Sequence, residues 1–436
     1  MEHGIDTGAL AIVAGCFVLW GLVSARLERW NITAPIAFVA LGLAVAHEPL
    51  SLIDVHLSST ALRSLAEVTL ALVLFCDASR VNVRELRADV EIPVKLLAIG
   101  LPLTVAAGAA CAALLFGGVD VWVAALIGAI VAPTDAALGA SILEDERVPM
   151  RVRRILNVES GLNDGIVTPF VNLFIAGAVA AEVSGTDGVA GAAKDLLVGA
   201  GVGTGVGLVG AVLLHVSMRK GWSAPAFRTL TVLAVALLAY AVAIQAGGNG
   251  FVGAFVGGLA FGSATPADHE VLMGFSDAMG ELLSMLVWFM FGAAMIVPAF
   301  EHLVWQDVVF AIAALTVVRM GPTAIALTRT GLDRSSVAFI GWFGPRGLAS
   351  VVFALIAYDS LEPDVGNQVL AAVTATVVLS VIAHGVTARP LSGRYGRRAA
   401  ALDPDQPEHA DRPALRPRLL TGERLRARPA RSRQVP

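Results

Sequence analysis

Long apolar segments recur along almost the whole chain and constrain its fold more than any other feature. We interpret thirteen of them as helical spans of a lipid bilayer, which needs about 20 apolar residues per crossing. They cover residues 8–25, 33–47, 61–78, 93–116, 121–143, 155–181, 188–217, 227–245, 249–263, 278–299, 303–328, 335–358 and 365–388. Only 15% of the 436 residues are charged, against about 25% in soluble domains. The sequence therefore predicts an all-α polytopic membrane protein and excludes a soluble globular domain and a nucleic-acid binder.

Basic residues are distributed unequally between the two sides of this map. When alternate loops are assigned to alternate sides, 27 of the 31 Lys and Arg residues fall on one side, and only Arg63 and Lys194 on the other. The basic side faces the cytoplasm by the positive-inside rule. The sequence thus predicts a multi-pass protein of the cell membrane with its N-terminus outside and its C-terminus in the cytoplasm. Residues 391–436 are predicted to form a disordered, basic cytoplasmic tail.

Five ionisable residues lie near the centres of predicted spans. They are Asp135, Glu159, Asp164, Arg319 and Arg346. A charge at this depth is costly, so such residues are functional candidates. If the five share one interior, three acids face two bases, and one carboxylate lacks a basic partner. That carboxylate must take up a proton or bind a cation, which favours a cation/proton exchanger.

Two spans are predicted to be interrupted near their middle. In residues 131–135, Pro133 removes a backbone donor and frees a carbonyl one turn earlier. Residues 344–347, Gly-Pro-Arg-Gly, also favour a break. Interrupted helices at corresponding positions of two halves point to a transporter site. We therefore expect inverted repeats with two broken helices crossing at the midplane.

The segment after the first break carries two pairs of polar residues four positions apart. Ser160 and Asp164 share one helix face, and with Thr134 they would form an oxygen-rich site for a hard cation. Glu159 and Asn163 share an adjacent face, where Asn163 is expected to orient Glu159.

At these residues the sequence resembles the monovalent cation:proton antiporter family of the sodium/proton exchanger type, over roughly residues 10–390. Residues 159–165 are similar to the family's Glu-Ser-x-x-Asn-Asp signature, and residues 342–350 are similar to the Arg-Gly motif of its second broken helix. Residues 75–77 and 249–259 resemble the same family more weakly.

The resemblance implies a role for each candidate residue. Asp164 would be the essential cation- and proton-binding carboxylate. Asp77 would lie along the cytoplasmic ion path. The further ligands or stabilisers of the broken helices would be Thr134, Asp135 and Ser160. Glu159 would pair with Arg319. From the buried charges themselves we also expect Arg346 to hold Asp135 ionised.

The resemblance also implies a domain organisation. Residues 1–92 and 183–300 would form a dimer domain with helices 1–3 and 7–10. Residues 93–182 and 301–390 would form a core domain with helices 4–6 and 11–13, which moves against the first.

The predicted function is that of a transporter and not of an enzyme. We expect electroneutral, one-for-one exchange of Na⁺ for H⁺ by alternating access, with K⁺ or Li⁺ as the alternative cation. Membrane lipid and a second copy in a homodimer are the other expected partners; neither a cofactor nor nucleic acid is expected. A K⁺/H⁺ antiporter, an intramembrane aspartyl protease using Asp135 and Asp164, and a channel or organic-anion symporter remain as alternatives.

Overall fold

The computed structural model describes residues 7–30, 32–81, 91–183, 188–265, 269–403 and 405–409. The ordered elements of these ranges are helices, and no strand occurs among them. The elements of the first half are α1 (Thr7–Glu28), α2 (Ala34–Ala46), α3 (Thr60–Ser79), α5 (Glu91–Lys95), η1 (Leu96–Gly100), α6 (Leu101–Leu115), α7 (Val121–Ile130), α8 (Ala140–Leu143) and α9 (Met150–Val183). Those of the second half are α10 (Gly188–Arg219), α11 (Pro225–Gln245), α12 (Gly250–Ala264), α13 (His269–Met290), η2 (Phe291–Met295), α14 (Ile296–Glu301), α15 (Trp305–Leu315), α16 (Val317–Ala326), α17 (Arg334–Trp342), α18 (Leu348–Ser360), α19 (Pro363–Ala399) and η3 (Pro407–His409).

The predicted spans and the helices agree. Each of the thirteen predicted segments overlaps one helix or one consecutive run of helices. In the described part of the chain, eight of these are long and apolar enough to cross a membrane, and α2, α7, α12 and α18 are shorter apolar helices. Helices are the expected solution because a chain in lipid must satisfy its backbone hydrogen bonds within each segment. The predicted all-α polytopic membrane fold is confirmed.

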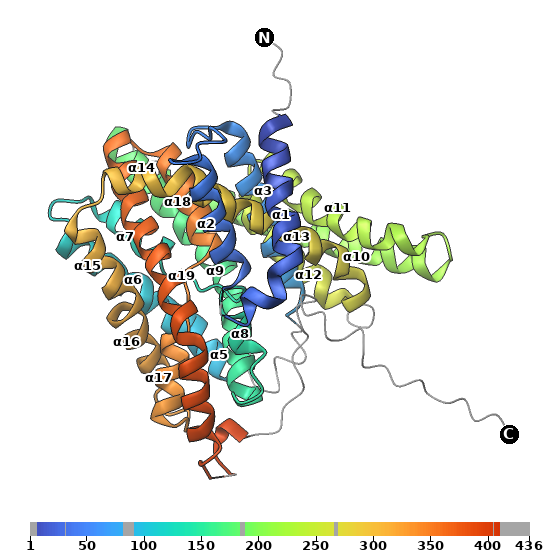
Figure 1. Ribbon diagram of the computed structural model, residues 1–436. Helices are drawn as coiled ribbons and strands as arrows, with labels where there is room; N and C mark the ends of the chain where they lie inside the picture. Colours follow the sequence, from blue (N-terminus) through green and yellow to red (C-terminus); the bar gives the residue numbers. More distant parts are fainter. Residues whose placement is uncertain are drawn as a thin grey trace.

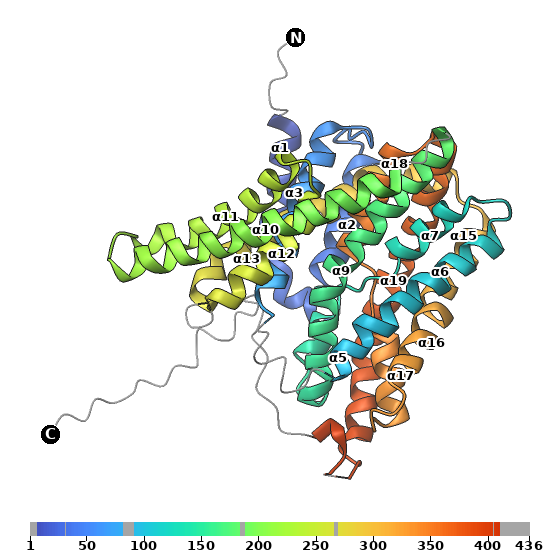
Figure 2. The same ribbon diagram turned by 180° about the vertical axis from the view of Figure 1, so that it is seen from behind.

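The helices form two groups that lie side by side. Figures 1 and 2 show α10 and α11 extending to one side of the molecule, next to α12 and α13. The opposite side is made by α6 and α15–α17. Between them, α9 runs past α3 and α12 as well as past α7 and α18. The helix that carries the Glu159–Asp164 motif therefore lies where the two groups meet.

Glycine residues let three helices of the first group approach backbone to backbone. A Cβ atom on Gly203 of α10 would overlap the backbone of Gly253 in α12, and one on Gly262 of α12 would overlap the backbone of Ser79 in α3. In a bilayer, where apolar burial does not drive helices together, such close packing supplies the attraction between them. It makes α3, α10 and α12 one tightly packed layer.

The start of the predicted tail is ordered, contrary to the expectation of disorder from residue 391. Helix α19 continues to Ala399, and η3 folds back beside it. The carboxylate of Glu408 is buried and accepts hydrogen bonds from the Asp333 amide (2.8 Å) and the Ser336 hydroxyl (2.6 Å) at the start of α17. The prediction failed here because Tyr395 and Ala399 extend the buried apolar face of α19 beyond residue 391, and because polar contacts of Glu408 hold η3. Residues 410–436 lie outside the described part.

Candidate ion-binding site

The two predicted interruptions exist and touch each other. The first separates α7 from α8 after Ile130, and the second separates α17 from α18 at residues 343–347. The amide of Asp135 donates to the carbonyl of Pro345 over 2.7 Å. The two extended segments therefore cross in contact, and the side chains of both surround the crossing.

The carboxylate of Asp135 binds backbone amides. Its Oδ2 accepts from the amide of Leu348, the first residue of α18, at 3.0 Å, and its Oδ1 accepts from Ala137 at 2.6 Å. The first amides of a helix have no partner within it, and the helix dipole there favours negative charge. Asp135 of one break thus caps the helix that begins at the other.

Arg346 is completely buried and binds backbone carbonyls, whereas Asp135 binds backbone amides. Its guanidinium donates to the carbonyls of Ala132 (3.2 Å) in the first break, Gly344 (3.1 Å) in the second, and Ala314 (3.2 Å) near the end of α15. These carbonyls are released where helices end, so a cation is favourable there. The prediction that Arg346 pairs with Asp135 is wrong: Asp135 binds backbone amides, and Arg346 binds backbone carbonyls through Nη1 and Nη2, while its Nε has no hydrogen-bond partner among the described residues. The breaks expose backbone donors and acceptors that a count of side-chain charges does not consider.

Gly347 is required for the seating of Asp135. A Cβ atom at this position would overlap the Asp135 carboxylate and its Cβ. We expect Gly347→Ala to displace Asp135 from the start of α18 and to lower the midpoint of thermal unfolding in detergent. Gly161→Ala is the matched control, since nothing lies within 4 Å of a Cβ there. Equal midpoints for the two variants would contradict this role.

Glu159 and Arg319 form a buried ion pair. Glu159 Oε1 lies 2.6 Å from Arg319 Nη1, and each side chain is 3% exposed. The pair joins α9 to the first turn of α16. This turn follows Thr316, where the chain leaves helical geometry between α15 and α16. The pair leaves Glu159 Oε2 and Arg319 Nε and Nη2 without hydrogen-bond partners among the described residues. Each charge therefore depends heavily on the other.

Three uncharged polar side chains meet beside the first break. The hydroxyls of Thr134 and Ser160 lie 2.9 Å apart, and the Asn163 amide donates to Thr134 Oγ1 over 2.7 Å. Asn163 thus contacts Thr134 and does not orient Glu159 as predicted. Ser160 and Asn163 are three residues apart on α9, so both turn toward the break. The result is a buried set of oxygen atoms next to the motif.

Asp164 lies one turn beyond Ser160 on the continuous helix α9 and is half-buried. Its neighbour Gly165 packs directly against the ring of Phe255 in α12, where a Cβ atom would overlap the ring. Asp164 is therefore located where the motif-bearing helix meets the layer of α3, α10 and α12.

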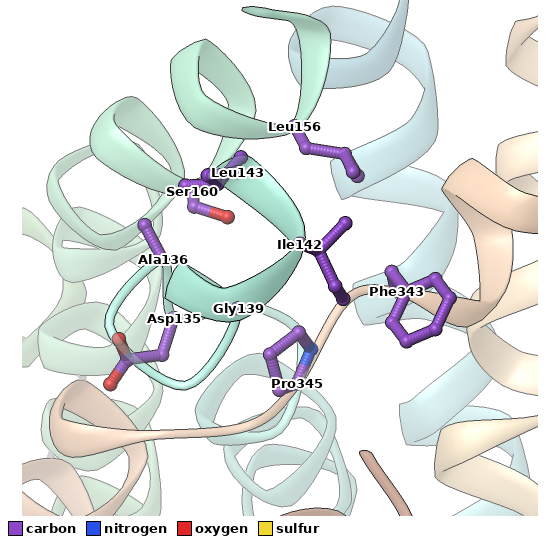
Figure 3. A pocket seen from close by; sticks show the side chains of 9 residues that line it. All are labelled: Asp135, Ala136, Gly139, Ile142, Leu143, Leu156, Ser160, Phe343 and Pro345. Atoms are coloured by element: carbon purple, nitrogen blue, oxygen red, sulfur yellow. The ribbon is translucent and has the colours of Figure 1, made fainter. Parts of the chain in front are cut away.

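A cavity lies next to the crossing, on the side of α8 and of the first turns of α9 (Figure 3). Its polar lining comes from Asp135 and Ser160. Its remaining lining residues are Ala136, Gly139, Ile142, Leu143, Leu156, Phe343 and Pro345. A water molecule or a small ion in this cavity would therefore have Asp135 and Ser160 as its polar neighbours.

Asp77 lies apart from this crossing, in the last turn of α3. Arg80 Nη1 lies 2.8 Å from its carboxylate, and Arg80 Nη2 lies 2.5 Å from Asp277 of α13. The arginine therefore links α3 to α13 at the end of the helix. Residues 82–90, which follow in the chain, lie outside the described part.

Sequence reasoning missed Ser380 and His384, which α19 contributes to the second break. Ser380 Oγ accepts the amide of Arg346 (2.7 Å), and His384 Nε2 lies 2.8 Å from the carbonyl of Trp342. In the sequence, Ser380 and His384 are two polar residues four positions apart inside the apolar span 365–388. The prediction considered only charged residues within spans and therefore did not include them.

Comparison with known proteins agrees with this architecture. Residues 12–393 match the family model described as sodium/hydrogen exchanger, transmembrane. The K⁺/H⁺ antiporter NhaP of Alkalimonas amylolytica is 26% identical over 87% of this chain and 66% of its own length. The K⁺/H⁺ antiporter NhaP2 of Shewanella sp. strain MR-4 is 27% identical over 79% of this chain and 59% of its own length. The chain thus spans less than two thirds of these two relatives.

Two further proteins extend the comparison. The Na⁺/H⁺ antiporter ApNhaP of Aphanothece halophytica is 24% identical over 86% of this chain and 71% of its own length. The solved structure of the sodium proton antiporter MjNhaP1 from Methanocaldococcus jannaschii superposes with a TM-score of 0.73 at 19% identity, covering 89% of this chain and 98% of that one. The fold is therefore shared with a solved antiporter. Because the family model covers nearly all of the helical part, this chain belongs to the sodium/hydrogen exchanger family, whose members are transporters and not enzymes.

Proposed function

We propose that this protein is a secondary antiporter that exchanges a monovalent cation for H⁺, with Na⁺ as the first candidate cation and K⁺ or Li⁺ as alternatives. The relatives give support for both main ions, since one carries a K⁺/H⁺ description and another a Na⁺/H⁺ description. Hard monovalent cations prefer oxygen ligands. Asp135, Thr134 and Ser160 bring carboxylate and hydroxyl oxygens to the crossing, and we propose that Asp164, one turn beyond Ser160 on α9, completes the ligand set.

The proposal rests mainly on the number of acidic and basic side chains near the crossing. Asp135 binds backbone amides, Arg346 binds backbone carbonyls, and Glu159 is paired with Arg319. With all three carboxylates and both guanidiniums ionised, the cluster holds one net negative charge. A proton or one monovalent cation neutralises it, and both together would leave an excess positive charge in a poorly solvated interior. Alternating occupancy by the two ions is the basis of exchange, and we assign it to Asp164.

The two helix groups suggest how the site alternates between sides. We assign residues 1–92 and 183–300 to a dimer domain and residues 93–182 and 301–390 to a core domain that moves against it. Asp164 would then lie at the moving boundary, next to Gly165, which packs against Phe255. The positive-inside distribution supports a cell-membrane protein with an outer N-terminus and a cytoplasmic C-terminus. We propose a homodimer, with Asp77 along the cytoplasmic ion path.

Exchange is expected to be one-for-one and electroneutral, because a single carboxylate would change its occupant. The apparent affinity for the cation should weaken as pH falls, because H⁺ then occupies the same carboxylate. The experiment is Na⁺-driven movement of H⁺ in proteoliposomes, followed with a pH-sensitive dye and repeated with Li⁺ and K⁺.

The control for charge movement uses the same K⁺ gradient with and without valinomycin, so that only the membrane potential differs. A Na⁺-driven rate that changes with the potential would mean that a second group titrates, with Asp135 as the first candidate. Absence of exchange with all three cations would refute the antiporter proposal itself.

A further inference from the structure

Helix α19 places two buried polar side chains against the backbone of the second break. Ser380 is 0% exposed and His384 is 3% exposed. Ser380 Oγ receives the amide proton of Arg346 over 2.7 Å, and His384 Nε2 lies 2.8 Å from the carbonyl oxygen of Trp342. Trp342 ends α17, and Arg346 stands two residues before α18. Ser380 therefore supplies an acceptor for the Arg346 amide, which the break removes from helical hydrogen bonding, and His384 adds a second donor to the Trp342 carbonyl beside the amide of Gly344 at 2.9 Å.

The direction of the hydrogen bonds defines how the histidine works. A carbonyl oxygen only accepts, so His384 Nε2 carries a proton and donates it to Trp342. The Ser380 hydroxyl, having accepted from Arg346, is free to donate its own proton to His384 Nδ1 at 3.1 Å. A protonated Nδ1 would instead donate to the Ser380 carbonyl at 2.8 Å. A ring that donates from Nε2 to Trp342 and accepts at Nδ1 from Ser380 Oγ makes both contacts at once.

We propose that Ser380 and His384 are positioning residues for the exchange reaction. They hold both ends of the extended segment 343–347, from which the Pro345 carbonyl binds the Asp135 amide. The same segment leads directly into Leu348, whose amide binds the Asp135 carboxylate. The serine and histidine thus hold the segment that positions Asp135 and Arg346, and they do so without contacting the transported ion. This inference rests on the proposed antiport only for its effect on transport.

The first experiment measures the backbone itself and does not depend on transport. Hydrogen–deuterium exchange followed by mass spectrometry reports local opening of amides. For the protein in detergent, we expect His384→Leu and Ser380→Ala to increase deuterium uptake in peptides covering residues 342–348 by about tenfold in rate, the scale of one lost buried hydrogen bond. Unchanged uptake in both variants would overturn the inference, whatever the protein transports.

The matched control is Thr376→Val on the same helix. Thr376 is equally buried, and its hydroxyl donates to the carbonyl of Ala372 within α19 rather than to the break. This variant should leave uptake in residues 342–348 at the wild-type rate. His384→Gln tests the specific role of Nε2, because its amide nitrogen can replace that donor. It should restore most of the protection that His384→Leu loses.

The second experiment measures transport in proteoliposomes with equal amounts of folded protein. His384→Leu and Ser380→Ala should weaken the apparent cation affinity by about tenfold or more, since a small displacement of site groups has large kinetic effects. His384→Gln should recover most of that affinity, and Thr376→Val should retain it. If His384→Gln is as impaired as His384→Leu, or if Thr376→Val is impaired equally, the side chains support the fold and do not position the site. Inactivity of the wild-type protein would instead refute the antiport proposal, and the deuterium result would still decide this inference.

Discussion

Asp164→Asn is expected to abolish cation/proton exchange while leaving the protein folded and inserted. The amide keeps the size of the side chain but can neither release a proton nor supply a negative charge. Asp164 is half-buried on the helix α9, so an amide of the same size fits the same space. The measurement is Na⁺-driven H⁺ flux in proteoliposomes, normalised to the amount of folded protein.

Ser160→Ala is the comparison that separates the ion-binding charge from its surroundings. Ser160 lies 2.9 Å from Thr134 and lines the cavity, so its loss removes one oxygen ligand and leaves the titrating group in place. We expect weaker cation affinity with exchange retained. The assignment of Asp164 fails if Asp164→Asn keeps more than about a tenth of the wild-type flux, because loss of the only exchanging group should remove the reaction rather than slow it modestly.

Glu159→Ala is expected to cause the largest loss of stability, about 3–5 kcal/mol, because it leaves the guanidinium of Arg319 buried and uncompensated. Arg319→Ala should cost a similar amount for the same reason. The double variant should be more stable than the sum of the two single losses predicts, since it buries no unpaired charge. Thermal unfolding in detergent measures all three variants, and additive losses would show that the two residues are not coupled.

An exposed ion pair on the neighbouring helix provides the control. Lys95 Nζ lies 2.7 Å from Glu91, which is 67% exposed. Such surface pairs contribute about 0–1 kcal/mol because water already solvates both charges. Glu91→Ala should therefore leave the unfolding temperature almost unchanged. A loss as large as that of Glu159→Ala would mean that the measurement responds to any lost ion pair and not to burial.

Several features of the site followed from local sequence alone. Mid-span proline and glycine residues indicated both interruptions, and the structure has them at residues 131–139 and 343–347. The rarity of charge in a membrane protein selected Glu159 and Arg319, which form a pair at 2.6 Å. These predictions succeeded because they depend on backbone chemistry and on the cost of burying charge, both of which are properties of short segments.

The partners of the remaining polar groups did not follow from local sequence. Asp135 binds the amide of Leu348 instead of Arg346, and Asn163 binds Thr134 instead of Glu159. A sequence lists side-chain charges, but it does not show which backbone amides and carbonyls a break leaves open. That depends on where two segments about 200 residues apart cross, and the crossing is a property of packing.

The sequence by itself determined the membrane-spanning helices, the two breaks and the family, because hydropathy, proline and glycine act locally and the motifs are contiguous. Only the tertiary structure decided how the buried charges are satisfied, and that Ser380 and His384 of α19 support the second break. The physical reason is that a buried polar group takes whichever donor or acceptor the fold brings within about 3 Å. In this protein, many of those donors and acceptors are backbone groups released by the two interrupted helices.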